Sequence, residues 1–327
     1  MESNCPGLAQ AGPAVPVPTW LRRATLQPQT LEDTAILAGA AIGALDSIVR
    51  RQERWAGAWR QRLALAAAAM TARQAGRVED EAALRDSFLL ARPGDFLSIG
   101  PAGLLLLGWR RLAARPAEAL LTKKSLAAVL EEFGFFTRGG AAVSDLADEL
   151  RQLGASVGTV ETLSGAVAAA ERHGFRRGVG AWLADALLAQ RLGWEQAVPL
   201  LGAEPALGAS RPRRVAAGAT APTIEAGPER TKALLAGQAR AALRAIDLST
   251  ELGRRAERLL ASAPKLRAKG ADIVVDRLLN DDALVASRGD KKAAMSDRGL
   301  RRLFDRLVDL GAVRELSGRT TFRLYGL

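Results

Sequence analysis

Arginine side chains close to the C-terminal end of the sequence are its strongest chemical signal. Within residues 296–310, apolar residues recur every three or four positions after Ser296, a residue type that caps helix N-termini. We therefore expect an amphipathic helix whose polar face carries arginines. Planar guanidinium groups suit both phosphates and base edges, which predicts contact with duplex DNA. The arginines expected on this helix are Arg298, Arg301, Arg302 and Arg306.

A β-hairpin is expected directly after this helix. Residues 312–316 and 320–325 alternate polar and apolar side chains around a Ser-Gly-Arg turn, which is typical of two short strands. Phe322 is among the apolar residues expected to pack against the helix. The hairpin adds Arg314, Arg319 and Arg323 to the residues expected to contact DNA.

The order of helix, helix and hairpin indicates a winged helix-turn-helix unit over residues 265–327. Its first helix is expected over 271–279, but residues 283–294 are only weakly apolar, so the middle helix would be irregular. Aspartates among the arginines also dilute the positive face. The alternative is that helix and hairpin only cap a helical core, with their arginines solvated.

Acidic residues form a second cluster of charge between positions 79 and 95. Paired carboxylates can act as acid and base or hold a hard cation, but acidic residues are also common in the first turn of a helix. Here three of them open an expected helix, which favours the second explanation. If the segment instead marks a pocket, its candidate residues are Arg85, Asp86 and Asp95.

The sequence offers little else for catalysis. It has one histidine, His173, and one cysteine, Cys5, with no motif around either, so it lacks the parts of a nucleophile-base pair or a zinc site. No glycine-rich phosphate-binding loop is present. We therefore expect no catalytic residue, no metal and no cofactor, and a protein that is not an enzyme.

Helical periodicity runs through most of the chain and predicts a mainly α fold, with a helical-bundle body and a small winged-helix-like unit of helices plus one β-hairpin. Tryptophans within the helices are expected in the core. The expected helices cover residues 30–50, 53–76, 79–91, 101–114, 124–133, 144–153, 159–173, 177–192 and 228–263. The expected divisions are a disordered or extended leader (1–29), the helical body (30–201), a Gly/Ala/Pro linker (202–228), a connecting helix (229–263) and the winged-helix-like unit (265–327).

Composition supports a helical protein that attracts anions. Of 327 residues, 48% are hydrophobic, enough for a large core, and only 5% are aromatic. The net charge of +11 would draw the chain toward phosphate backbones or anionic lipid, although arginine-rich composition also follows from GC-rich coding. The longest apolar run, residues 103–109, is much shorter than the roughly 20 residues of a membrane span. We expect a cytoplasmic protein without a signal peptide or membrane contact.

Two groups of motifs resemble an uncharacterised bacterial family. The first comprises Trp59-Arg60-Gln61-Arg62, Glu79-Asp80-Glu81-Ala82-Ala83-Leu84-Arg85-Asp86 and Trp109-Arg110-Arg111-Leu112-Ala113. The second comprises Arg302-Leu303-Phe304-Asp305-Arg306-Leu307, Ser317-Gly318-Arg319 and Phe322-Arg323-Leu324-Tyr325-Gly326-Leu327. Both are similar to domain of unknown function fourteen-oh-three, which is typical of alphaproteobacterial genomes and plasmids and has no established activity.

The wing motif also resembles the winged tail of some Fic-type proteins, which favours DNA binding. The surroundings of His173 do not match the histidine-led catalytic loop of Fic enzymes, so that activity is not implied. The leading hypothesis is a DNA-binding accessory or regulatory protein whose helical body forms a homodimer or docks a protein partner. The alternative is a helical protein-interaction module without nucleic-acid function, and an enzyme of unrecognised type ranks third.

Overall fold

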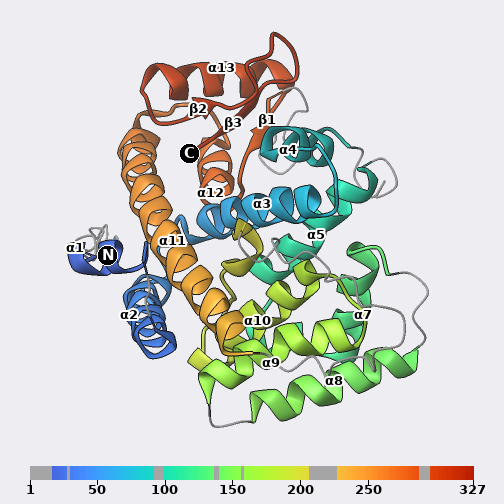
Figure 1. Cartoon of the computed structure of the whole chain (residues 1–327). Helices are drawn as coiled ribbons and strands as arrows, with labels where there is room; N and C mark the ends of the chain where they lie inside the picture. Colours follow the sequence, from blue (N-terminus) through green and yellow to red (C-terminus); the bar gives the residue numbers. More distant parts are fainter. Residues whose placement is uncertain are drawn as a thin grey trace, which may run out of the picture.

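The computed structural model describes residues 17–27, 30–91, 99–135, 140–155, 158–205, 227–286 and 295–327. Helices dominate these residues, with a small antiparallel sheet close to the C-terminal end (Figure 1). The expected mainly α fold class is confirmed.

Most N-terminal helices of the body follow the expected ranges within a few residues, whereas the short helices over residues 19–24 and 117–120 were not expected. Side chains cap several of them, as where Thr30 accepts a hydrogen bond from the Asp33 amide at 3.0 Å. These helices are α1 (Thr19–Ala24), α2 (Leu31–Val49), α3 (Ala56–Gln74), α4 (Glu81–Leu90), α5 (Gly100–Ala114), α6 (Ala117–Leu120) and α7 (Lys123–Glu132).

The second half of the body is built in the same way. Glycines with positive φ follow several helices, as expected of C-terminal caps; Gly193, with φ of 63°, ends α10. The elements are α8 (Gly140–Gly154), α9 (Thr159–Arg172), α10 (Arg177–Leu192), the 3-10 turn η1 (Leu201–Ala203), α11 (Pro228–Ser262) and the 3-10 turn η3 (Ala263–Lys265).

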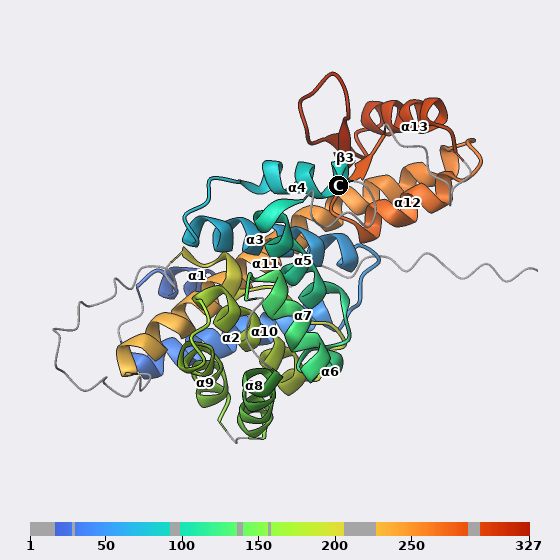
Figure 2. The same ribbon diagram turned by 90° about the vertical axis from the view of Figure 1, so that its right-hand side faces the viewer.

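The C-terminal unit lies at one end of the molecule (Figures 1 and 2). Its three short strands form an antiparallel sheet in the order β1-β3-β2, with Leu284 opposite Tyr325 and Glu315 also opposite Tyr325. Its elements are α12 (Ala271–Asn280), β1 (Leu284–Val285), α13 (Asp297–Asp309), β2 (Arg314–Glu315) and β3 (Leu324–Gly326).

Helix α11 is the longest element and organises the body. Its 35 residues extend about 50 Å, from the C-terminal unit to the far side of the body (Figure 1). It packs along α2 and also contacts α3 and α9, while α3 pairs with α5 and α9 with α10. The sequence suggested a connecting helix here, but α11 buries one whole side in the body.

Buried tryptophans link neighbouring helices. The indole of Trp59 donates to the carbonyl of Ala245 in α11 at 2.9 Å, and that of Trp182 donates to the carbonyl of Gly108 in α5 at 2.9 Å. Trp109 is fully buried and donates to Thr71 Oγ1 at 3.0 Å. Each ring fills the core while its N–H is satisfied, which confirms the expectation that tryptophans pack the interior.

Part of the expected leader is structured. Residues 19–24 form α1, where Leu21 is buried and Arg22 pairs with Asp247 of α11 at 2.7 Å. The prediction of an extended leader is wrong for this segment because Leu21 gains burial against the core. Residues 1–16 lie outside the described residues.

The body also continues slightly beyond its predicted end at residue 201. The buried Asp185 carboxylate accepts hydrogen bonds from the amides of Leu200 and Leu201, at 2.8 Å and 3.0 Å. Glu204 is buried too, and its carboxylate pairs with Arg240 at 2.9 Å and with Arg244. Residues 202–205, which composition assigned to a linker, are therefore fastened to α10 and α11. Residues 206–226 lie outside the described residues.

The helices of the described residues include none that combines the length and the apolar character needed to cross a lipid bilayer.

The core leaves no room for a side chain at Gly202. A Cβ atom there would lie 2.3 Å from Cη2 of Trp109 and 2.7 Å from Cβ of Ala67. We expect Gly202→Ala to lower the free energy of unfolding by about 1–3 kcal/mol, the usual cost of overpacking. Urea titration followed by circular dichroism measures this change.

The matched control is Gly39→Ala in α2, where an added Cβ meets nothing within 4 Å. A helical alanine is more stable than glycine, so this variant should gain about 0.5–1 kcal/mol. Equal effects of the two substitutions would contradict the packing around Trp109.

Candidate nucleic-acid interface

Helix α13 forms where the sequence predicts it. The Ser296 hydroxyl accepts a hydrogen bond from the Gly299 amide at 3.3 Å, and Gly311, with φ of 63°, follows the helix. One side of α13 is buried, and its Phe304 packs on Tyr325 of the sheet. Its buried residues are Leu300, Leu303, Phe304 and Leu307.

An aromatic stack fixes α13 on the sheet. The rings of Phe304 and Tyr325 lie parallel, with centroids 4.4 Å apart and an interplanar angle of 8°. Tyr325 belongs to the central strand β3, whose neighbours are β1 and β2. This contact holds the exposed face of α13 at a set angle to all three strands.

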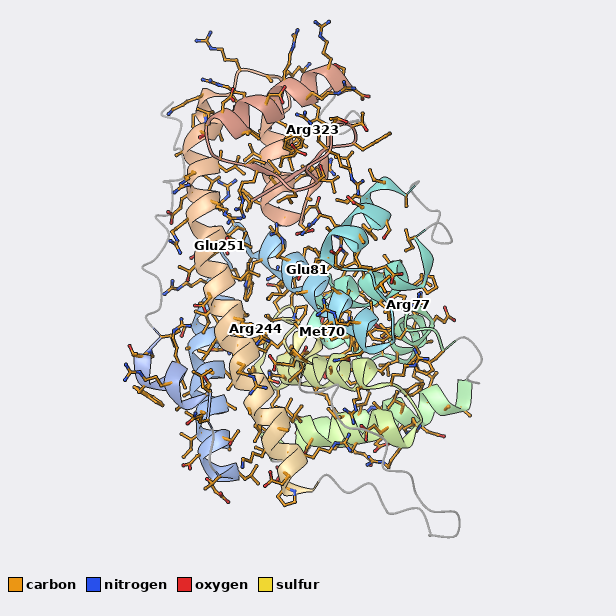
Figure 3. The ribbon with its side chains drawn as sticks, turned by 45° about the horizontal axis from the view of Figure 1, so that its top comes forward. Met70, Arg77, Glu81, Arg244, Glu251 and Arg323 are labelled. Atoms are coloured by element: carbon orange, nitrogen blue, oxygen red, sulfur yellow. The ribbon has the colours of Figure 1, made fainter. Side chains whose placement is uncertain are left out.

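The exposed face of α13 carries unneutralised arginines. Arg298, Arg301, Arg302 and Arg306 are all exposed and form no ion pair with any residue that the structure describes. Figure 3 shows long side chains with nitrogen at their tips projecting from this helix away from the body. The first half of α13 has a net positive charge, with three arginines and Asp297, whereas in the second half Asp305 and Asp309 outnumber Arg306.

The arginines of the hairpin, unlike those of α13, lie close to carboxylates. Arg314 lies 3.8 Å from Glu251 of α11, and Arg319 pairs with Asp86 of α4. Arg323 lies 4.0 Å from Glu315 and donates from Nε to the carbonyl of Arg319 at 3.1 Å. All three remain exposed, but each has an acidic neighbour.

The predicted hairpin is confirmed as an antiparallel pair, with shorter strands and a longer loop, residues 316–323. Phe322 does not pack on the helix as expected: it is 53% exposed and has φ of +54°. Its left-handed backbone breaks the alternation on which the prediction rested. The irregular middle helix was expected over residues 283–294, but residues 284–285 form strand β1, which was not predicted, and residues 287–294 lie outside the described residues.

A hollow of about 410 Å³ lies between α13 and this loop. Arg301 and Asp305 line it from the helix, and Phe322 and Arg323 line it from the loop. Cationic and aromatic side chains of two separate elements therefore face the same space.

A buried carboxylate attaches the C-terminal unit to the body. Asp282, in the turn between α12 and β1, has no exposed side-chain surface and pairs with Arg62 of α3 and with Arg85 of α4, the latter at 2.6 Å. Arg62 also donates to the carbonyls of Asp282 and Leu327, at 3.3 Å and 3.5 Å. Arg255 of α11 donates to the Leu327 carbonyl at 3.0 Å.

The charges around Asp282 keep it ionised. Burial alone would raise the pKa of this carboxyl, but Arg62, Arg85 and nearby Arg110 more than offset that effect and hold the pKa below its ordinary value of 3.8. Arg110 itself stacks its guanidinium over the ring of Phe88, 4.0 Å from the centroid.

Two of the three candidate pocket residues lie at this junction. Arg85 is buried against Asp282, and Asp86 pairs with Arg319, so both connect α4 to the C-terminal unit. Asp95 lies outside the described residues. Asp80 caps α4 by accepting from the Ala83 amide at 2.8 Å, and Glu81 lies in the first turn, so these two acids take the positions typical of a helix N-terminus.

Sequence reasoning missed Asp282. Its neighbours Asn280 and Asp281 indicated only the end of a helix, and nothing local singles out one aspartate of this turn. The burial of this carboxylate cannot be inferred from nearby residues, because its partners Arg62 and Arg85 are 220 and 197 residues away in the sequence.

The family described as "Protein of unknown function (DUF1403)" matches residues 10–327. The match covers nearly the whole chain, so the protein belongs to this family, as the motifs of the sequence indicated. No curated protein matches the chain.

The ion pairs of Asp282 predict a large stability effect. Asp282→Asn leaves Arg62 and Arg85 without their counter-charge in a buried position, which should lower the free energy of unfolding by about 3–5 kcal/mol. Denaturant unfolding measures this loss. The control Asp276→Asn, an exposed change in the same α12, should alter the free energy of unfolding by no more than about 0.5 kcal/mol. Similar losses in both variants would contradict a stabilising role for the ion pairs of Asp282.

The lowered pKa of Asp282 also predicts acid sensitivity. Because the folded pKa lies below the unfolded value near 3.8, the stabilisation is complete above that value and is lost as the pH falls through the folded pKa. The free energy of unfolding of the wild type should therefore fall over this acid range, and that of Asp282→Asn should change less. Parallel pH curves for the two proteins would be inconsistent with an ionised Asp282.

Proposed function

We propose that this protein binds duplex DNA through its C-terminal unit, with α13 in the major groove and the loop between β2 and β3 against the backbone. The observation that carries the proposal is the exposed face of α13, where four arginines lie together without ion pairs to described residues. Such arginines can be neutralised by phosphates or can donate to base edges without breaking an internal contact.

The order of the elements supports this assignment. A helix, a strand, a second helix and two further strands, with the sheet order β1-β3-β2, follow the plan of a winged-helix domain. In that plan α13 is the recognition helix and residues 316–323 are the wing. That plan also has a helix directly before the recognition helix; the described residues between β1 and α13 include none, and residues 287–294 lie outside them.

The distribution of charge along α13 favours a particular orientation. Recognition helices of this class contact bases mainly with their N-terminal residues. Arg298, Arg301 and Arg302 outnumber the one acidic residue of that half, Asp297, and the dipole of the helix adds positive potential at the same end. The aspartates of the second half would face away from the centre of the contact.

The wing arginines have a supporting role in this proposal. Arg319 already neutralises Asp86, so it holds the wing on α4. Arg314 and Arg323, with carboxylates at about 4 Å and exposed side chains, can exchange these weak surface contacts for phosphates. Binding energy is therefore expected mainly from α13. The function is one of binding, not catalysis, and we place the protein among regulatory or accessory DNA-binding proteins.

Fluorescence anisotropy with a labelled mixed-sequence duplex at increasing salt tests the proposal. Each phosphate contact contributes nearly one unit to the slope of log K against log salt. Changing Arg298, Arg301 and Arg302 together to Ala should make this slope shallower by about 2 to 3 and weaken binding at low salt, with unchanged helicity.

The matched control changes Arg23, Arg73 and Arg115 to Ala, which removes the same charge from exposed positions of the body. This control should keep the slope of the wild type. Equal losses in both triple variants would mean that net charge alone attracts DNA. Absence of binding by the wild type at low salt would leave the C-terminal unit as a structural cap.

A further inference from the structure

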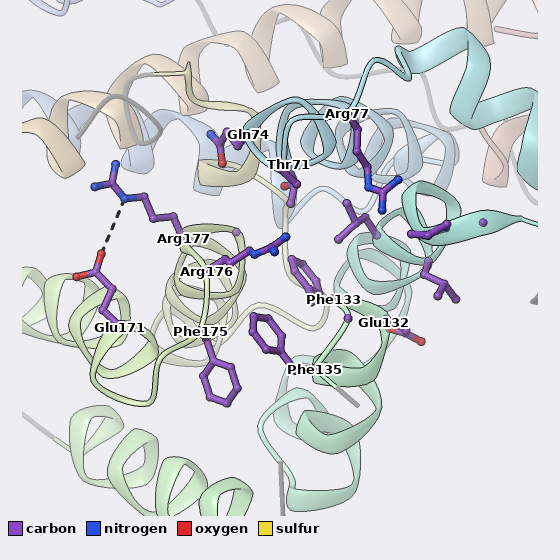
Figure 4. A pocket seen from close by; sticks show the side chains of 17 residues that line it. Thr71, Gln74, Arg77, Glu132, Phe133, Phe135, Glu171, Phe175, Arg176 and Arg177 are labelled. Atoms are coloured by element: carbon purple, nitrogen blue, oxygen red, sulfur yellow. Dashed lines mark ion pairs between the residues drawn. The ribbon is translucent and has the colours of Figure 1, made fainter. Parts of the chain in front are cut away.

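The helical body contains a cavity of about 750 Å³ where the ends of several helices meet (Figure 4). The C-terminal ends of α3, α7 and α9 and the N-terminal ends of α5 and α10 surround it. No residue that lines it belongs to the C-terminal unit. Its volume is within the range typical of sites for small organic molecules.

Aromatic rings form one wall of this cavity. Phe133 and Phe175 belong to the buried core, and the ring of Phe135 meets that of Phe175 edge to face, with centroids 5.0 Å apart. Leu104 and Leu105 of α5 extend the apolar lining. A flat or branched apolar group would find dispersion contacts on this wall and would be removed from water.

The charged groups of the cavity leave a positive excess. Its two carboxylates already have cationic partners: Glu132 pairs with Arg111, and Glu171 pairs with Arg230 and lies 4.0 Å from Arg177, which also lines the cavity. Arg176 is exposed and has no ion pair with a described residue, and Arg77 has only Glu79 at 3.8 Å. In Figure 4 the side chain of Arg176 reaches toward Phe133, and that of Arg77 extends from the end of α3 along another side of the same cavity.

The backbone adds to this positive potential. Helix α10 begins directly after Arg176, and no side chain caps its N-terminus. The amide dipoles at the start of such a helix favour a negative charge. Gly178, in the first turn, has no room for a side chain, since a Cβ atom would lie 2.7 Å from Cγ2 of Thr71. The start of α10 thus packs tightly against α3 at the edge of the cavity.

We propose that this cavity binds one small organic anion that joins an apolar, aromatic-sized body to a single carboxylate, sulfonate or phosphate group. The apolar body would contact Phe133, Phe135 and Phe175, while Arg77 and Arg176 receive the anionic group. Two guanidinium groups beside an aromatic wall match a ligand of this composition and would select against neutral or cationic compounds of the same shape. The site is independent of the proposed DNA contact.

The test compares two probes that share their aromatic rings. The anionic probe is 8-anilinonaphthalene-1-sulfonate, and its neutral counterpart is N-phenyl-1-naphthylamine. For the full-length protein we expect one sulfonate bound per chain by calorimetry, and tighter binding of the sulfonate than of the neutral probe. In the double variant Arg77→Gln/Arg176→Gln, sulfonate affinity should fall about tenfold or more, the loss expected from charge-assisted hydrogen bonds.

Controls separate the site from general dye adsorption. Affinity for the neutral probe should change less than about twofold in the double variant, since the aromatic wall is intact. Arg73→Gln/Arg115→Gln, which removes two exposed arginines that do not line the cavity, should bind the sulfonate like the wild type. Several dye molecules per chain, or equal sulfonate affinity in both double variants, would overturn the proposal. Fluorescence anisotropy with labelled DNA measures the proposed DNA contact of the same variants in a separate experiment.

Discussion

The buried carboxylate of Asp282 is the interaction on which the arrangement of the C-terminal unit depends. A carboxylate without exposed surface is tolerated only with counter-charges in contact, and these come from α3 and α4. Its position in the turn before β1 means that the same contact places the sheet, and through the Phe304–Tyr325 stack it also places α13. The exposed face of α13 is thereby held rigidly on the helical body.

Two groups of arginines in this chain differ in their surroundings. Arg62 and Arg85 are mostly buried and are neutralised by Asp282, so their charge stabilises the fold and is not offered to a ligand. On α13 the same residue type remains exposed and without ion pairs to described residues. Net charge alone does not distinguish the two kinds, whereas their surroundings do. The proposed DNA contact rests on the second kind only.

The two proposed sites lie on different parts of the chain and use related chemistry. The C-terminal unit offers exposed arginines along α13, which suits an extended polyanion. The cavity of the body offers Arg77 and Arg176 beside aromatic rings, which suits a compact anion with an apolar part. Helix α11 contacts both α9 of the body and α12 of the C-terminal unit, so it is a continuous element between the two regions.

Most helix boundaries could be predicted because their causes are local: a capping side chain such as Thr30, a glycine such as Gly193, and apolar residues at helical spacing. The apolar stripe of α13 and its exposed arginines also followed from spacing alone. Strand β1, with two residues, and the burial of Asp282 had no such local signal. Only the tertiary structure decided which charges are neutralised, because ion pairs such as Arg62–Asp282 and Arg319–Asp86 join residues 220 and 233 positions apart.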